Sequence, residues 1–412
     1  MAQGYLKSYL APVILSIRNI MMLAVSVFCT AGVYFSEGGE NGMSQNAGLP
    51  TAEELHIERF ANYYDKVFAK GFKASGCPGA IVTIVQDTNV VYMRGFGVNK
   101  AGTKDSVSTS SLFRIGSLSK GFTGVLCGIL VEQGIIHWED KVMDIIPEFR
   151  LKDMEQAKRI TIAHLLSHSV GLPRHTFTDL VEDGMTITEI MDRLDEVNLL
   201  GEEGKFFAYQ NHAYSIIEEI LWRKTGTTFQ DLLSQYLLKP AGMQHVSTDM
   251  SSFMACDDKT CPHRGGKKGY TAVPWNGKYY NAASCGGINA TGNDMAEWLK
   301  VLLGHRENVI GDSALMQVFT PYIDIKDNDY YHNWYGVQSV GYAMGWRVLE
   351  CGYHQIEYHA GSVNDYRSEI AIDHQNNIAI CVLFNAQNSY ARNVVRDFLL
   401  TYKVYEKVVN QM

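Results

Sequence analysis

Basic stripes, internal repeats and low-complexity tracts are all missing from this chain of 412 residues. Its net charge is −8 and only 19% of its residues are charged, so a nucleic-acid role is disfavoured. No period of 20–50 residues recurs, which argues against solenoids and propellers. Nine prolines and 37 glycines are too few for a collagen-like or low-complexity chain. The 46% of hydrophobic residues instead indicate a globular protein that can bury a substantial core.

Long hydrophobic runs are also scarce, and the one of note lies at the N-terminus. Residues 19–36 carry no charge and follow Lys7 and Arg18. This arrangement is typical of a secretory signal, and 18 uncharged residues also suffice for a single membrane anchor. We therefore expect residues 1–36 to be a signal peptide or membrane anchor and the Gly/Asn-rich residues 37–51 to be a linker. The protein is then exported, and is either periplasmic or anchored to the outer face of the cytoplasmic membrane.

The cysteines and histidines give no clear metal or disulfide framework. Of eight cysteines, seven remain if Cys29 leaves with a signal, and an odd number argues against complete pairing. Cys256 and Cys261 could form a small loop disulfide, or could be two free thiols. His164 and His168 have helical i, i+4 spacing, but the glutamate of a zincin motif is absent between them. We therefore expect no metal and no other cofactor.

Strand patterns lie near both ends of the chain and helical patterns lie between them. The simplest assembly is an α+β fold with one antiparallel sheet made by the two ends and covered by the terminal helices. A mainly helical lobe is then inserted, and the cleft between the lobes is a natural ligand site. The expected helices span 51–73, 121–133, 188–197, 212–223, 229–238 and 391–408, and the expected strands 79–85, 90–97, 341–348, 354–359, 368–372 and 378–384.

The sharpest chemical motif is Ser117-Leu118-Ser119-Lys120, which opens a long apolar segment. On the first turn of a helix, residues i and i+3 share one face, so Lys120 can reach the Ser117 hydroxyl. A partly desolvated lysine loses its proton more readily, and the neutral amine can accept the proton of an attacking serine. The motif alone is also compatible with a helix cap and an exposed lysine.

Two further elements downstream strengthen the catalytic interpretation. In Tyr209-Gln210-Asn211, a phenol beside a lysine can relay protons, and the Asn211 amide can hold the lysine or bind a substrate carbonyl. In His359-Ala360-Gly361-Ser362, the glycine lets a substrate approach the strand, and a nearby N–H can complete an oxyanion hole. Taken singly, each element is better explained as packing or turn residues.

Together and in this order, the three elements resemble the serine β-lactamase/penicillin-binding protein superfamily. The similarity is to the branch of class C β-lactamases, D,D-peptidases and family VIII esterases, and it runs through ITIAHLLSHSVGLP, CGGINATGNDMAEWL and YAMGWRV. The resemblance implies a β-lactamase/transpeptidase-like domain over residues 52–408. Its sheet lobe would span about 52–115 and 335–408, and its helical lobe about 116–334.

The resemblance also implies roles for individual residues. Ser117 resembles the nucleophile, Lys120 the assisting lysine and Tyr209 the general base or acid. Asn211, His359, Gly361 and Ser362 resemble the substrate-binding residues, with the Ser117 and Ser362 N–H groups as the oxyanion hole. The implied reaction is acyl transfer from an amide, β-lactam or ester. The alternatives are an esterase of the same fold, a penicillin-binding sensor that acylates without turnover, and a catalytically inactive structural homologue.

The third motif departs from the family pattern at two positions. Class C β-lactamases usually have Lys-Thr-Gly where this chain has His359-Ala360-Gly361. A histidine is only partly charged near neutral pH, so efficient β-lactam hydrolysis is disfavoured and peptidase or esterase chemistry is favoured. This predicts that a carboxylate-bearing substrate binds more weakly as the pH rises past about 6.5–7.5. The expected partner is a small-molecule or peptide substrate.

Overall fold

The computed structural model describes residues 52–409, apart from 268, 327, 328, 333, 335 and 353. The described residues all belong to one compact unit, which begins at Ala52. The predicted signal or anchor (1–36) and the linker (37–51) therefore lie outside the described residues. Within the described part, no helix combines the length and the apolar character needed to cross a membrane.

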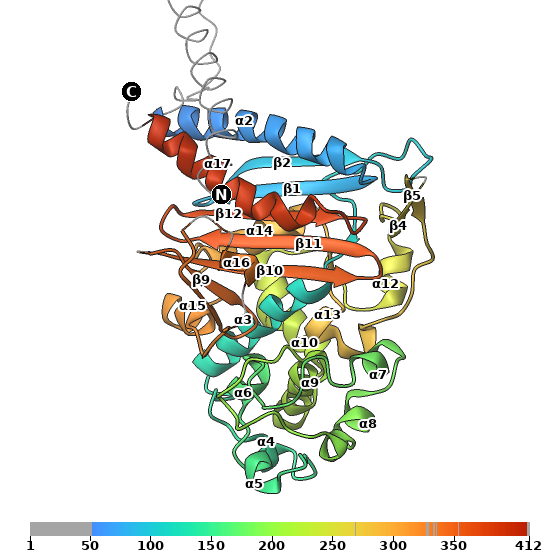
Figure 1. Ribbon diagram of the computed structural model, residues 1–412, viewed down its shortest axis with the longest axis vertical. Helices are drawn as coiled ribbons and strands as arrows, with labels where there is room; N and C mark the ends of the chain where they lie inside the picture. The colour runs from blue at the N-terminus through green and yellow to red at the C-terminus, as the bar shows by residue number, and fades with distance from the viewer. Residues whose placement is uncertain are drawn as a thin grey trace, which may run out of the picture. The chain divides into compact units, whose positions relative to one another are not determined.

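One antiparallel sheet is built from the two ends of this unit (Figure 1). Its strand order within the described residues is β2-β1-β12-β11-β10-β9-β8-β7, so the first hairpin pairs directly with the last strand. The strands are β1 (Gly79–Gln86), β2 (Asn89–Gly97), β7 (Ile323–Asp324), β8 (Ser339–Tyr342), β9 (Arg347–Glu350), β10 (Gln355–Val363), β11 (Tyr366–Asp373) and β12 (Ile378–Phe384).

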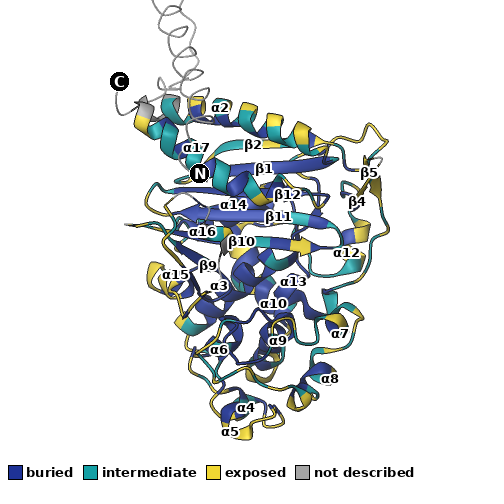
Figure 2. Cartoon of the chain, viewed as in Figure 1, coloured by how far each residue is buried: buried dark blue, intermediate teal, exposed yellow. Residues whose placement is uncertain are grey.

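Both faces of this sheet are covered, which explains why its central strands are almost continuously apolar. Every residue of β12 is buried (Figure 2). Successive side chains of a strand point to opposite faces, so both faces of the sheet are apolar here. On one face, α2 (Ala52–Ser75) and α17 (Ala391–Val409) pack their aromatic side chains against the sheet. On the other face, α3 (Ser119–Glu132) and α14 (Gly292–Leu302) meet through Phe122 and Trp298, whose ring centroids lie 4.0 Å apart.

The inserted segment is mainly helical, and α3 runs through its centre. Most of α3 is buried, because SKGFTGVLCGILVE offers no polar face. A Cβ on Gly124 would lie 1.9 Å from the Met344 carbonyl oxygen, so glycine permits a close approach of α3 to the turn after β8. The other helices are α4 (Val142–Ile145), α5 (Met154–Ala157), α6 (Ile162–Leu166), α7 (Thr178–Glu182), α8 (Ile187–Met191), α9 (Asn211–Thr225), α10 (Phe229–Leu233), α11 (Lys239–Ala241), α12 (Met250–Ala255), α13 (Ala283–Gly286), α15 (Asp312–Phe319) and α16 (Asp329–His332).

The predicted α+β architecture, with a sheet made by the two ends, is confirmed. The main differences are local. The strand expected over 341–348 is interrupted by a turn at Gly345, whose φ of 88° separates β8 from β9. The helix expected over 188–197 ends at Met191, and β7 lies in a range expected to be helical. Two small pairs were not predicted: β3 (Phe113–Arg114) with β6 (Asn289–Ala290), and β4 (His263–Gly266) with β5 (Gly269–Ala272).

Candidate active site

Ser117 lies on a single 3-10 turn, η1 (Gly116–Leu118), which leads directly into α3. The second serine of the motif, Ser119, is fully buried. Its Oγ donates to the Gly116 carbonyl at 2.7 Å and accepts from the Ile288 N–H at 3.1 Å. Ser119 therefore ties the turn to the chain beside it, and Ser117 is the half-buried serine of the motif.

The amine of Lys120 is held by two acceptors in the interior. Its Nζ donates to Asn211 Oδ1 at 2.9 Å and to the Cys285 carbonyl oxygen at 2.8 Å. It also lies 4.7 Å from the centroid of the Tyr209 ring. The structure thus brings Lys120, Tyr209 and Asn211 together, as the motif order predicted. With two N–H groups engaged, a neutral amine keeps its lone pair for a third direction.

Tyr209 is fixed at both its backbone and its ring. It precedes α9, and its carbonyl oxygen accepts from the His175 N–H at 2.9 Å. Its ring packs against His168, with centroids 4.3 Å apart. The Tyr209 hydroxyl is buried and has no hydrogen-bond partner among the described residues. An immobilised phenol with an unused hydroxyl can exchange a proton with a group that enters the site.

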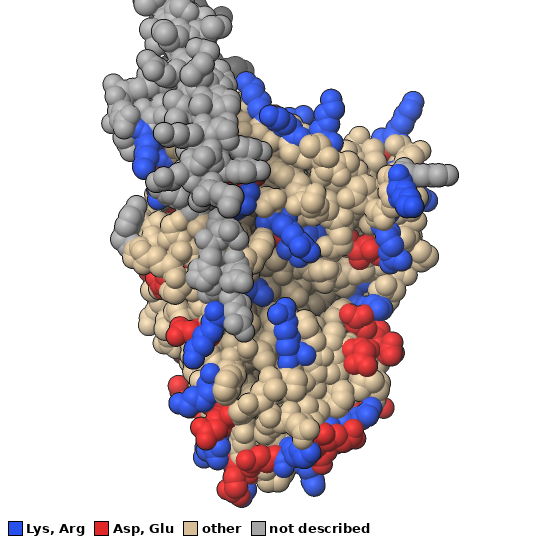
Figure 3. All heavy atoms as spheres, in the orientation of Figure 1, with Lys and Arg blue, Asp and Glu red and all other residues tan. Residues whose placement is uncertain are grey.

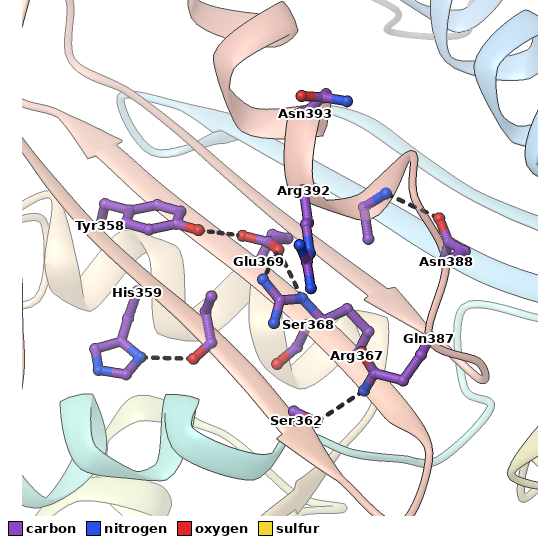
Figure 4. Close-up of polar contacts among 12 residues, drawn as sticks. Tyr358, His359, Ser362, Arg367, Ser368, Glu369, Gln387, Asn388, Arg392 and Asn393 are labelled. Carbon is purple, nitrogen blue, oxygen red and sulfur yellow. Dashed lines mark hydrogen bonds and ion pairs between the residues drawn. The ribbon is translucent and has the colours of Figure 1, made fainter. Parts of the chain in front are cut away.

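His359 belongs to a series of hydrogen-bonded, buried side chains that lies beside Tyr209. His168 Nδ1 accepts from the Gln210 N–H at 3.2 Å, so its Nε2 carries the proton and donates to Tyr342 Oη at 3.2 Å. Tyr342 Oη then donates to His359 Nε2 at 3.1 Å. The remaining His359 nitrogen, Nδ1, donates to the Ala360 carbonyl oxygen at 2.9 Å (Figure 4). Each imidazole in this series carries one proton.

The charge expected on His359 is therefore not supported. Burial, followed by the charges of Arg347 and Lys120, holds the pKa of His359 well below 6.5. Burial and the Lys120 charge hold the pKa of His168 well below 6.5 as well. Both histidines are neutral near pH 7, because loss of solvent disfavours an imidazolium. The structure therefore does not favour carboxylate binding governed by the titration of His359, and the predicted pH dependence of substrate binding is left to experiment.

Gly361 and Ser362 bring the backbone of β10 against the turn that carries Ser117. A Cβ on Gly361 would lie 2.1 Å from the Ile115 carbonyl oxygen and 3.1 Å from the Ser117 nitrogen, so only glycine fits here. A Cβ on Gly116 would lie 2.7 Å from the Ser362 nitrogen. The two N–H groups predicted to form an oxyanion hole therefore belong to backbone segments in close contact. The exposed Ser362 hydroxyl accepts from Gln387 Nε2 at 2.8 Å (Figure 4).

Arg347 is a site residue that the motifs did not reveal. It begins β9, and its guanidinium carbon lies 5.7 Å from the centroid of the Tyr209 ring and 5.6 Å from that of Tyr342. Its Nη1 is buried without a hydrogen-bond partner among the described residues. The segment YAMGWRV, which supported the family resemblance, contains this arginine, but nothing in the sequence places it beside Tyr209.

The metal and disulfide alternatives have no support in the geometry of the described residues. His164 Nδ1 accepts from the Thr161 N–H at 3.1 Å and completes a helix cap, whereas His168 belongs to the series through Tyr342. No cluster of three or more potential metal ligands occurs in the part of the chain that the structure describes. Cys256 and Cys261 are free thiols, and the Cys256 thiol donates to the Asp258 carbonyl oxygen at 3.4 Å.

The fold is shared with a solved penicillin-binding protein homologue. The octameric homologue from Pyrococcus abyssi superimposes with a TM-score of 0.71 at 22% identity, over 82% of this chain and 77% of that one. This similarity shows the β-lactamase/transpeptidase-like fold. A family model described as Beta-lactamase matches residues 64–402, and the chain therefore belongs to the beta-lactamase family. The predicted superfamily and fold class are confirmed.

Curated relatives extend the similarity over most of the sequence. Protein flp of Staphylococcus aureus (strain NCTC 8325 / PS 47) is 23% identical over 358 residues, which cover 84% of this chain and 68% of that protein. Penicillin-binding protein 4 of Amycolatopsis lactamdurans is 29% identical over 171 residues, which cover 42% and 45% of the two chains. Family membership supports the serine hydrolase class.

Proposed function

We propose that this protein is an exported serine hydrolase that forms an acyl-enzyme at Ser117. One observation carries the proposal: the Lys120 amine, three residues from Ser117, is held by Asn211 Oδ1 and the Cys285 carbonyl beside the Tyr209 ring. Holding the amine and the phenol in place before substrate arrives lowers the cost of proton transfer in the reaction.

The proposed reaction has two steps. Ser117 Oγ attacks the substrate carbonyl, and its proton passes to Lys120 or Tyr209 while the Ser117 and Ser362 N–H groups stabilise the oxyanion. The proton then goes to the leaving group as its bond to the carbonyl carbon breaks. In the second step, water attacks the acyl-enzyme, gives up a proton to the same groups and releases the acid, which restores the Ser117 hydroxyl.

We further propose that the preferred substrate is an amide, such as a short peptide, with a carboxylate on its leaving-group side. Arg347 supplies a permanent positive charge beside Tyr209, the group proposed to exchange a proton with the leaving group. Its unpartnered Nη1 is suited to a carboxylate oxygen, because a buried donor without an acceptor is costly. A neutral His359 does not supply this charge. The alternative substrates are short esters without a charge, and β-lactams.

The test compares matched substrates with purified protein and a Ser117→Ala control. A peptide ending in a free carboxylate should have a kcat/KM at least about tenfold above that of the same peptide ending in an amide. A p-nitrophenyl ester and a chromogenic cephalosporin complete the set. Intact-mass analysis should show an adduct that forms and decays, and none with Ser117→Ala. A stable adduct without release would indicate a penicillin-binding sensor, and the absence of both turnover and adduct would overturn the proposal.

Export is proposed from the uncharged run 19–36 behind Lys7 and Arg18. In an expressing cell, the protein should be degraded by protease added outside the cytoplasmic membrane, and a cytoplasmic marker enzyme should survive. Survival of both proteins would argue against export. The same fractionation separates a released periplasmic protein from one held at the membrane.

A further inference from the structure

A line of hydrogen bonds extends from Lys120 away from the reacting atoms. Asn211 Oδ1 accepts from Lys120, and on its other side Asn211 Nδ2 donates to Tyr279 Oη at 3.2 Å. Tyr279 Oη in turn donates to Glu182 Oε1 at 3.0 Å. Glu182 is the last residue of α7, and its second oxygen pairs with Lys278 at 2.5 Å. None of the three predicted motifs contains Tyr279 or Glu182.

The Glu182 carboxylate at the end of this line determines which group donates and which accepts in each of its hydrogen bonds. An ionised Glu182 can only accept, so the single hydroxyl proton of Tyr279 points toward it. The Tyr279 oxygen then offers only lone pairs to Asn211, which must present its NH₂ group to Tyr279. The amide oxygen of Asn211 is consequently turned toward Lys120. A flipped amide would place its NH₂ group against the donors of Lys120 and leave both without an acceptor.

The backbone around Tyr279 is held in an unusual conformation. Tyr279 has φ of 69°, in the left-handed region that a bulky residue rarely adopts. Two glycines make room for it, because a Cβ on Gly287 would lie 2.5 Å from its carbonyl oxygen and one on Gly286 would lie 3.1 Å from its ring. The buried Arg114 donates to the Asn276 and Lys278 carbonyl oxygens in the same loop. Such strain persists where the surrounding structure imposes it, and it is frequent at functional sites.

A purely stabilising role does not account for Glu182. The Lys278 and Glu182 side chains are 41% and 33% exposed, and ion pairs with that exposure add little to stability. Acidic side chains gather beside α7 on the face shown in Figure 3, and the neighbouring Asp183 is also exposed. Glu182 itself bonds to the tyrosine that contacts Asn211.

We infer that Tyr279 and Glu182 are positioning residues that orient the Asn211 amide and thereby fix the Lys120 amine. The inference rests on the proposed function for its effect on rate, but not for its effect on Lys120 itself. Without the Tyr279 hydroxyl or the Glu182 charge, the amide oxygen no longer faces Lys120 in every molecule. The Lys120 amine then loses one of its two hydrogen-bond acceptors and is held less firmly beside the Tyr209 ring.

The test uses Tyr279→Phe and Glu182→Gln, with Asp183→Asn as the control that removes an equal charge at the next residue. In stopped-flow acylation of the full chain, both variants should acylate about 10- to 100-fold more slowly with KM changed less than about threefold. The double variant Tyr279→Phe/Glu182→Gln should acylate no more slowly than Tyr279→Phe alone, because both substitutions interrupt the same line of hydrogen bonds. Asp183→Asn should match the wild type.

The environment of the Lys120 amine is followed independently by NMR of ¹³C-labelled lysine, with Lys120→Met to assign the signal. A displaced or broadened Lys120 signal in both variants, but not in Asp183→Asn, supports the inference even if the wild type acylates no probe, a result that would refute only the proposed function. An unchanged Lys120 signal in folded variants would overturn the inference. Wild-type acylation rates in both variants, with an active wild type, would overturn it as well.

Discussion

The two hydrogen bonds that join His168, Tyr342 and His359 can both be broken by removing the hydroxyl oxygen of Tyr342. Tyr342→Phe keeps the ring, which is fully buried, and deletes the hydroxyl that accepts from His168 and donates to His359. His168 is then left with a buried N–H that has no acceptor, and His359 with a buried nitrogen that has no donor. Neither imidazole can regain water, because both are about 1% exposed or less.

The expected loss of stability is large for so small a change. Each buried group left without its partner costs about 1–3 kcal/mol, and removing the tyrosine's own hydroxyl offsets part of the sum. We expect the free energy of unfolding to fall by about 2–4 kcal/mol, a substantial share of the roughly 5–15 kcal/mol typical of folded proteins. Since the Tyr209 ring packs on His168, kcat/KM should also fall by about tenfold.

Denaturant unfolding of wild type, Tyr342→Phe and Tyr64→Phe measures this cost. Tyr64 is also fully buried, but its hydroxyl has no partner among the described residues, so the same deletion there should be neutral or stabilising. Equal free energies of unfolding for the two variants would refute the hydrogen bonds that Tyr342 makes to the two histidines. So would a Tyr342→Phe variant that loses less than about 0.5 kcal/mol, the size of an ordinary surface substitution.

Three further outcomes are expected. Gly361→Ala should abolish acylation of the folded protein, as measured by adduct mass, because the new Cβ would lie 2.1 Å from the Ile115 carbonyl oxygen. With a carboxylate substrate, KM should stay flat between about pH 6 and 8, because His359 is already neutral; a rise centred near pH 6.5–7 would show that it titrates. Burial raises the pKa of Glu357 to about 8, so the stability that this group contributes is complete below about pH 4.5 and is lost as the pH rises through 8. Glu357→Gln should therefore flatten the fall in Tm between pH 5 and 9, and parallel curves would contradict the assignment.

The parts of the fold that the sequence predicted are those set by local pattern. The β-branched runs of β1 and β12 and the apolar stripe of α17 are visible as periodicity, and the first two motifs mark Ser117, Lys120 and Tyr209. Pairing between distant residues has no such signature. Tyr342 and His168 are separated by 174 positions, and the sequence around either residue does not indicate that they form a hydrogen bond.

Burial explains why the structure does not favour the charge predicted on His359. A histidine in the third motif suggested a partial charge because its ordinary pKa is near 6.5. The structure encloses His359 behind Tyr342 and beside Arg347, and that enclosure removes the charge. Likewise, the left-handed backbone of Tyr279 depends on close packing against Gly286 and Gly287 and on the distant Arg114, and the sequence pattern indicates neither.

The pairing of β1 with β12 has a consequence for how the chain folds as it is made. Ala80 pairs with Phe384, and the Tyr405 hydroxyl donates to the His56 carbonyl oxygen at 2.9 Å. The first elements of the domain therefore cannot complete their native contacts until the last elements have been synthesised. Contacts between such distant positions slow folding. Until β12 arrives, β1 and β11 expose unpaired edges that favour association with other chains. A truncation before Ile378 would make this state permanent, whereas linking the adjacent helices α2 and α17 and opening the chain in an exposed loop of the helical lobe would relieve the delay.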